Sequence, residues 1–523
     1  MGTLNPPASG VTVRMYRQGL GDCFLLAFPT GQTGQAFYML IDCGVIFGTQ
    51  SAASKMQDVA TDIEAATGGD IHLLVATHEH WDHLCGFLFA GDIFQRMRIH
   101  NLWLAWTEDP TDTLAQQLQA EFHANRAALR MALNLISDSD TAAPITNLLH
   151  FFGDPMAASD SGTSMASANL QNTGAALQAI RDFASKMNAS PVYRRPGEGP
   201  LSLPQVNGLS GVSNVRIYVL GPPHDEKTLK DINPSTKGQE VYKQGAGASQ
   251  DSTGGAGEAL TASKAFFLAV QDEDQISSAD KELHELSFPF DQKVRISSEE
   301  AKQNEFFRTY YGFDDPATPA GTGAEQSENR KDGAWRRIDD DWLGAAGELA
   351  LQLDSYTNNT SLVLAFELVN TKKVLLFVAD AQIGNWLSWD DLSWSVPDTN
   401  GTPQTIRIGD LLARTVFYKV GHHGSVNATI RGYGSTPKGL ELMTSPDLVA
   451  MIPVDRQMAL KKRWNMPCEP VLQRLEDKTG QRVLRIDDNT TPRTQGGMSD
   501  VAWKALQANY QETKLYIEYT VTD

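Results

Sequence analysis

The stretch THEHWDHLCG, Thr77 to Gly86, holds three histidines and two acidic residues within six positions. It directly follows the apolar run IHLLVA (71–76), which has the length and composition of a buried strand. Imidazole nitrogens and carboxylate oxygens are the ligands that zinc and similar divalent ions accept. Histidine is scarce in this chain, with 11 in 523 residues. The crowding therefore predicts a metal site at the end of a strand.

Four side chains of this stretch are candidate metal ligands. Donors so close in sequence do not readily all reach one ion, so we expect two metals. His78 and His80 would bind one, and Asp82 and His83 would bind the other. The alternative is a group of surface histidines without a ligand, which the scarcity of histidine disfavours.

Further candidates of the same kind follow later strand-like runs. His224 comes after VRIYVLG (215–221), Asp380 lies in LLFVADAQIG, and His422 and His423 lie in FYKVGHHGS. A metal site built from the ends of several strands needs this distribution, because rigid strands hold their ligands with little reorganisation.

The bulk composition limits the classes of partner. With 41% hydrophobic and 20% charged residues the chain has the composition of a folded globular protein. A formal charge of −19 disfavours duplex nucleic acid as a partner, so small molecules or short substrates are the expected partners. The four cysteines include no C-x-x-C pair, so we expect a reducing compartment. We find no secretory leader and no apolar window of about 18 residues, which predicts a cytoplasmic protein without a membrane anchor.

Strands and helices recur along the chain, which predicts a mixed α/β fold. Three strands should form a meander between Val11 and Asp42, and a helix should end at Gly68 and Gly69. A hairpin is expected through Asn370 and Thr371. The remaining expected elements are strands at TVFYKVG (415–421), LVAMIPV (448–454) and KLYIEYTV (514–521), and a helix near 470–478.

Two long segments look like insertions. Residues 109–190 have helical periodicity, with a first helix that can start at Asp109 and Pro110 and a second that includes Leu177. Residues 227–341 are rich in Gly, Ser, Asp and Glu, and we expect a polar, partly mobile insertion. Both should project over or beside the site.

The motifs resemble those of a known family. THEHWDH matches the T-H-x-H-x-D-H signature of the metallo-β-lactamase fold superfamily. GLGDCFLL, YMLIDCG, NNTSLVLAFELVNTKKVLLFVADAQ and YKVGHHGS resemble, in the same order, elements of the branch that includes a domain of bacterial DNA-uptake channel proteins and phosphorylcholine esterases. The resemblance covers about Val11–Phe87 and Asp354–Val454. It implies one domain over 1–523, a four-layer αββα sandwich with large insertions.

The resemblance also implies a ligand set. The first metal would take His78, His80 and His224, and the second Asp82, His83 and His423, with His422 as the alternative to His423 and Asp380 bridging both ions. The implied ions are two Zn2+, with Mn2+ as the alternative. A hydroxide between two such cations would attack the substrate, so no serine or cysteine nucleophile is required. Asp82 would also take part in proton transfer, and Asp42 could accept the other N–H of a ligand histidine or cap its strand.

The leading functional hypothesis is therefore a dinuclear metal hydrolase. Because GHHGS resembles the branch above, we expect a phosphoester or phosphodiester substrate. The same site could open a lactone, a β-lactam or another acyl compound, since the fold hosts both chemistries. A non-catalytic binding or sensing protein is the third reading. A redox di-iron enzyme is disfavoured, because it needs a carboxylate where His80 stands.

Overall fold

The structure is a computed structural model that describes most of the chain. The described residues are 2–32, 34–135, 145–146, 148–153, 172–212, 214–231, 240–242, 296, 298–311, 344–397, 401–433, 436–487 and 498–522. Contacts divide the chain into two compact units, Met1–Ala120 with Asn147–Thr253 and Gln352–Asp523, and Glu121–Thr146 with Gly254–Leu351. All candidate site residues belong to the first unit. Most of the polar segment 227–341 lies outside the described residues.

The first sheet has eight strands and begins with the predicted meander. β1 (Gly10–Tyr16), β2 (Phe24–Pro29) and β3 (Ala36–Ile41) pair in antiparallel order. Strands β5 (Leu73–Ala76), β7 (Leu102–Ala105) and β8 (Pro191–Arg194) continue from β3 in parallel. At the other edge β20 (Tyr516–Thr522) pairs with β1, and β19 (Tyr510–Glu512) pairs with β20. The order is β19-β20-β1-β2-β3-β5-β7-β8.

The second sheet has six strands, in the order β18-β17-β14-β11-β10-β9. β10 (Val363–Leu368) and β11 (Val374–Phe377) form the predicted antiparallel hairpin. β9 (Val215–Gly221) pairs antiparallel with β10 at one edge. From β11 onward the sheet is parallel through β14 (Thr415–Lys419), β17 (Val449–Ile452) and β18 (Val483–Arg485).

The strand residues alternate between two buried environments. Val13, Phe24 and Phe28 of the first sheet share a core with Phe366 and Phe377 of the second. The ring centroids of Phe24 and Phe377 are 5.6 Å apart, and those of Phe28 and Phe366 are 6.3 Å apart. The intervening residues of each strand point to the opposite face, as a period of two requires. The two sheets therefore pack against each other, and the predicted mixed α/β class is confirmed.

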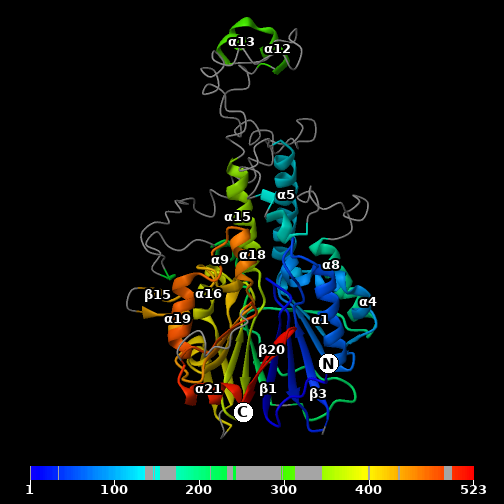
Figure 1. Cartoon of the computed structure of the whole chain (residues 1–523), viewed down its shortest axis with the longest axis vertical. Coiled ribbons are helices and arrows are strands. Elements are labelled where there is room, and N and C mark those ends of the chain that lie inside the picture. Colours follow the sequence, from blue (N-terminus) through cyan, green and yellow to red (C-terminus); the bar gives the residue numbers. More distant parts are fainter. Residues whose placement is uncertain are drawn as a thin grey trace. The chain divides into compact units, whose positions relative to one another are not determined.

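Helices cover the outer faces of the sheets. α1 (Ala52–Thr67) and α8 (Thr173–Ser185) pack on the first sheet. α16 (Ile383–Leu387), α17 (Ile408–Ala413) and α19 (Glu469–Thr479) pack on the second. Figure 1 shows α1 and α8 beside the blue strands and α16 and α19 beside the yellow ones. The second predicted helix of 109–190 is therefore part of the layered core.

The helix ends are set by local capping. α1 ends at Gly68, whose φ of 65° is left-handed, as the glycine pair predicts. α5 (Thr113–Leu135) begins later than the predicted start at Asp109 and Pro110. The side chain of Asp112 accepts from the backbone N–H groups of Leu114 and Ala115 and so caps the helix, at 2.9 and 3.0 Å.

The remaining elements of the described residues belong to one or both of the two units. They are β4 (Asp70–Ile71), α2 (Trp81–Leu84), α3 (Gly86–Phe89), α4 (Gly91–Phe94), β6 (Arg98–Ile99), η1 (Trp106–Glu108), α9 (Glu226–Leu229), α12 (Ser298–Gln303), α13 (Glu305–Tyr311), α15 (Gly344–Asn359), η7 (Ser388–Asp391), β12 (Ser393–Pro397), β13 (Pro403–Arg407), η8 (Gly421–Gly424), β15 (Gly432–Tyr433), β16 (Thr436–Pro437), η9 (Gly439–Leu442), α18 (Arg456–Lys461) and α21 (Asp500–Gln507). Within the described ranges, no helix combines the length and the apolar character that crossing a bilayer requires.

Candidate metal centre

Strand ends bring the candidate ligands together. His78 directly follows Thr77 at the end of β5, and α2 carries Asp82 and His83. In the second sheet Asp380 follows β11, while His422 and His423 follow β14. The N–H of Leu362 donates to the carbonyl of Thr77 at 2.9 Å. This hydrogen bond joins the two sheets at the edge where the candidate ligands gather.

Four donor atoms face one another inside this cluster. The Nε2 atom of His83 is 3.2 Å from Oδ2 of Asp380 and 3.9 Å from Oδ2 of Asp82. The Nε2 atom of His423 is 3.1 Å from Oδ2 of Asp82 and 3.7 Å from Oδ2 of Asp380. Donors about 2.1 Å from one ion in a tetrahedron lie about 3.4 Å apart. These four histidine-to-carboxylate distances scatter around that value and are compatible with one divalent cation.

The other nitrogen of each of these imidazoles is held by the protein. Nδ1 of His83 lies 2.8 Å from Oδ2 of Asp42, and Nδ1 of His423 lies 2.8 Å from the carbonyl oxygen of Pro453. Asp42 also accepts from the backbone N–H and the hydroxyl of Thr77, at 2.8 and 2.6 Å. Both rings therefore present Nε2 to the cluster. Asp42 thus contacts His83, a candidate ligand, and also binds Thr77 at the end of β5.

A close approach of two loops fixes where α2 lies. A Cβ atom on Gly44 would be 2.3 Å from the carbonyl carbon of Asp82 and 2.5 Å from the backbone nitrogen of His83. Only glycine permits this contact between the loop after β3 and the first turn of α2. The glycine of YMLIDCG therefore serves the packing of the ligand loop.

Asp22 and Lys419 were not among the predicted ligands, yet both belong to the cluster. Lys419 is buried, and its Nζ lies 2.5 Å from Oδ2 of Asp22 and 3.3 Å from Oδ1 of Asp380. Asp22, His83, Asp380 and His423 offer donor atoms that all lie within 4.8 Å of one another. However, Asp22 approaches Nδ1 of His83 and of His423, at 4.0 Å each. Asp22 lies on the Nδ1 side of both rings, so we assign it to holding the rings in place and not to binding metal. In the sequence, the only clue to it was that GLGDCFLL contains an acid.

The other half of the cluster consists of His78 and His80. Nε2 of His78 lies 3.1 Å from Nδ1 of His80, and Nδ1 of His78 lies 3.1 Å from the hydroxyl of Thr77. Nε2 of His80 is buried and has no hydrogen-bond partner among the described residues. Its nearest acid is Asp354, with Oδ1 at 3.8 Å. This acid was also missed, because nothing in the sequence around it marks it.

The adjacent histidines after β14 have different surroundings. Both are in the left-handed region, with φ of 41° for His422 and 52° for His423, which is unfavourable for side chains with a Cβ. Nδ1 of His422 lies 2.9 Å from the hydroxyl of Ser425. His423 instead faces Asp82 and Asp380 with Nε2. The structure therefore favours His423 over His422 as the ligand.

His224 is not brought to this cluster. Its Nε2 lies 2.8 Å from Oδ2 of Asp112, its ring lies against Trp106, and its side chain is 38% exposed. The reason is topological. β9 is two places from β11 in the sheet, or about 10 Å at the usual strand spacing. The proposal that His224 binds the first metal therefore lacks geometric support.

The histidines fall into two electrostatic classes. Burial lowers the pKa of His80 to about 3 and that of His422 to about 4, and it also lowers the pKa of His78. Burial acts in the same direction on His83 and His423. There, however, carboxylates led by Asp380 outweigh it, and the pKa of both imidazoles is raised.

The carboxylates complement this pattern. Although burial opposes it, His83 together with Lys419 holds the pKa of Asp380 well below its usual range. His83 and His423 likewise lower the pKa of Asp82 despite burial. Burial, reinforced by Asp82 and Asp380, raises the pKa of Asp354 to about 8. Oδ1 of Asp82 and Oδ1 of Asp354 are buried without a hydrogen bond among the described residues. Such atoms need a cation or a donor, so the donor set fits divalent metal.

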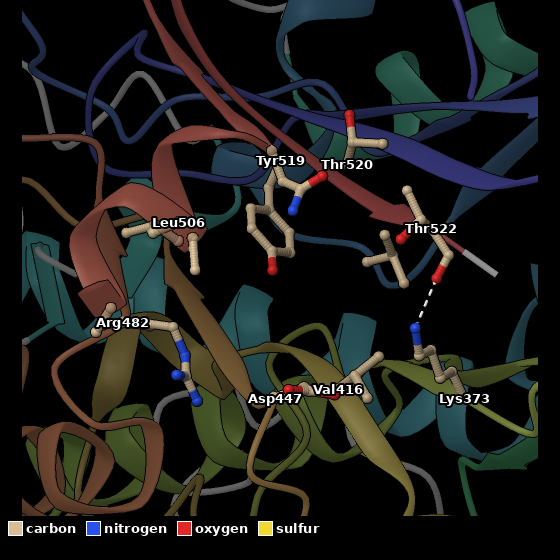
Figure 2. Close-up of a pocket in the computed structure, with 12 residues that line it drawn as sticks. Lys373, Val416, Asp447, Arg482, Leu506, Tyr519, Thr520 and Thr522 are labelled. Atoms are coloured by element: carbon tan, nitrogen blue, oxygen red, sulfur yellow. Dashed lines mark hydrogen bonds between the residues drawn. The ribbon is translucent and has the colours of Figure 1, made fainter.

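A separate cavity of about 260 Å³ lies at the other end of β14. Val416, Tyr519 and Thr522 line it (Figure 2). Lys373 donates to the carbonyl of Thr522 at 2.8 Å, and Nε of Arg482 donates to the carbonyl of Leu448 at 3.0 Å. Because these basic groups are bound to the backbone, we assign the chemistry to the metal cluster and not to this cavity.

Comparison with known proteins gave no match. No family model matches the chain, and neither a curated protein nor a solved structure matches it.

Proposed function

We propose that this protein is a metal-dependent hydrolase of the metallo-β-lactamase fold that binds two divalent cations and cleaves a phosphoester or phosphodiester. The observation that carries the proposal is the facing set of Asp82, His83, Asp380 and His423, whose donor separations of 3.1 to 3.9 Å suit one ion. His78 and His80, with donor nitrogens 3.1 Å apart, would hold the second ion.

The arrangement of the layers supports the proposed fold. The two sheets share one core, and helices pack on the outer face of each. These features support the proposal of a four-layer αββα sandwich, which has helices outside two facing sheets. The ligands follow strands of both sheets, and the Leu362 to Thr77 hydrogen bond joins the sheets beside them. A site between two sheets, at strand ends, is what the sequence resemblance implies.

When bound, two divalent ions act as Lewis acids and make water a nucleophile at neutral pH. The residues of the chain contribute orientation and charge. Asp42 and the Pro453 carbonyl hold the two imidazoles in one tautomer and one orientation. Lys419 binds Oδ1 of Asp380, which leaves Oδ2 to face the histidines. Asp82 holds metal in this proposal; with His83 and His423 lowering its pKa, it is a weak proton acceptor.

The substrate class rests on the resemblance of GHHGS, and three model substrates test it. The purified protein would be assayed for bound metal and then for hydrolysis of bis(p-nitrophenyl) phosphate, a lactone and a cephalosporin. We expect about two equivalents of metal and phosphodiester cleavage that a chelator abolishes. Cleavage of the lactone or the cephalosporin without cleavage of the phosphodiester would indicate that the substrate is an acyl compound. A preparation that takes up less than about one equivalent from added zinc or manganese would contradict the proposal.

A further inference from the structure

We infer that Asp354 is the positioning residue of His80, the carboxylate that accepts the Nε2–H of this histidine when Nδ1 binds metal. The inference rests on the proposed function, because it concerns a ligand of the two-metal centre. The family resemblance does not include Asp354 among the residues it implies, so this role comes from the structure alone.

The other three ligand histidines establish the pattern. In each, the nitrogen that faces away from the cluster has a partner: the Thr77 hydroxyl for His78, Asp42 for His83, and the Pro453 carbonyl for His423. In His80, Nδ1 faces His78, so Nε2 is the outward nitrogen. Metal-binding histidines almost always donate this second N–H to a carboxylate, a carbonyl or water. His80 therefore requires an acceptor at Nε2.

Asp354 is placed to be that acceptor. Its Oδ1 lies 3.8 Å from Nε2 of His80, and in the described part of the chain neither atom has a hydrogen bond. The side chains are 1% exposed for His80 and 16% exposed for Asp354. The other carboxylate oxygen accepts from Nδ2 of Asn358 at 3.2 Å, which turns Oδ1 toward the histidine. A separation of 3.8 Å between these two atoms is too long for a hydrogen bond. A movement of less than about 1 Å of either side chain would bring them within hydrogen-bond distance.

Among the described residues, aromatic side chains flank the ring of His80. Phe151 and Phe152 lie against its ring, with centroids 5.4 and 5.2 Å away. Asp354 lies in the last turns of α15, which lead into β10, and β10 is the direct neighbour of β11. The acid thus comes from a chain segment closer to the cluster than the one that carries His224.

The test measures metal affinity, not activity, with zinc or cobalt as the probe. Asp354→Ala should keep one tight ion and weaken the other by about 10- to 100-fold, the usual effect of removing such an acceptor. Asp354→Asn, which retains an acceptor oxygen, should lose less. His224→Ala should bind both ions like the wild type. Glu367→Gln, a buried carboxylate paired with Arg414 elsewhere on β10, controls for the loss of a buried acid.

Two results would overturn the inference. One is wild-type affinity for both ions in Asp354→Ala. The other is a loss of affinity in Asp354→Ala as large as that in His80→Ala, which would make Asp354 a direct ligand. Failure of the wild type to bind metal would instead refute the proposed function, so the two failures are distinguishable.

Discussion

The two halves of the candidate centre differ in how completely the protein holds them. In the half formed by Asp82, His83, Asp380 and His423, both imidazoles are anchored at Nδ1 and face carboxylates at Nε2. In the half formed by His78 and His80, Nε2 of His80 has no hydrogen bond among the described residues, and Oδ1 of Asp354 lies 3.8 Å from it. The first half is organised before any ion binds, whereas the second needs a small movement. We therefore expect the two ions to bind with unequal affinity.

The difference has an electrostatic basis. Carboxylates surround His83 and His423 and raise the pKa of both rings, so protons there offset the negative charge. His78 and His80 are buried with lowered pKa and are neutral near pH 7. A cation entering the His83 half displaces protons, while one entering the His78 half meets two neutral imidazoles, whose mutual hydrogen bond it replaces.

Removing the shared carboxylate should have the largest effect. Asp380→Ala deletes the group that faces both His83 and His423, and we expect metal affinity to fall by more than about 100-fold, beyond the effect of losing an outer partner. Phosphodiester cleavage should be lost with it. Metal titration and the hydrolysis assay measure both, with Glu367→Gln as the control. Phosphodiester activity that survived Asp380→Ala would contradict the site assignment.

Lys419→Met should destabilise the metal-free protein by about 3–5 kcal/mol, because it leaves the buried Asp22 and Asp380 carboxylates without their cation. Added metal should recover part of the loss. Chemical denaturation with and without zinc measures the free energy of unfolding. Lys438→Met, whose partner Asp390 is 46% exposed, should cost no more than about 1 kcal/mol. Equal losses in the two variants would show that the buried cation has no special role.

Asp42→Asn should make the His83 half resemble the His80 half. The amide no longer provides a charged acceptor for Nδ1 of His83, so we expect one ion to bind about 10- to 100-fold more weakly. Calorimetric titration with zinc resolves the two sites. Asp70→Asn, which changes a similar histidine contact with His100 away from the cluster, should leave both affinities unchanged. If Asp42→Asn weakened the two ions equally, the halves would not be independent.

The smallest effect is a difference in pH dependence between the two ions. Because the pKa of His83 and His423 is raised, these rings hold protons that metal must displace, and the affinity of their half should fall as the pH is lowered. Each displaced proton corresponds to roughly a tenfold change per pH unit. The pKa of His80 is about 3, so its ring holds no proton to displace near neutral pH. In this half Asp354, whose pKa burial raises to about 8, is the group that can release a proton, so the half should respond less than the one with two protonated rings. Titrations in buffers of different ionisation enthalpy would report the protons released, and equal release at both steps would argue against this assignment.

The sequence predicted the elements that depend on local patterns. Apolar runs of strand length separated by turn residues indicated the meander and the β10–β11 hairpin, and both are confirmed because such runs and turns are local signals. The glycine pair after α1 gave the correct helix end. The start of α5 was wrong, because Asp109 and Asp112 are both plausible caps and only the fold shows which one accepts the helix N–H groups.

What the sequence by itself determined is which candidate donors one loop supplies, since His78, His80, Asp82 and His83 occupy a span of six residues just after a strand end. Only the tertiary structure decided which distant residues join them. It brings His423 and Asp380 to the cluster, places His224 against Asp112, and adds Asp22, Lys419 and Asp354. The physical reason is that the neighbours of a strand end depend on the order of strands in the sheet, and nothing local in the sequence records that order.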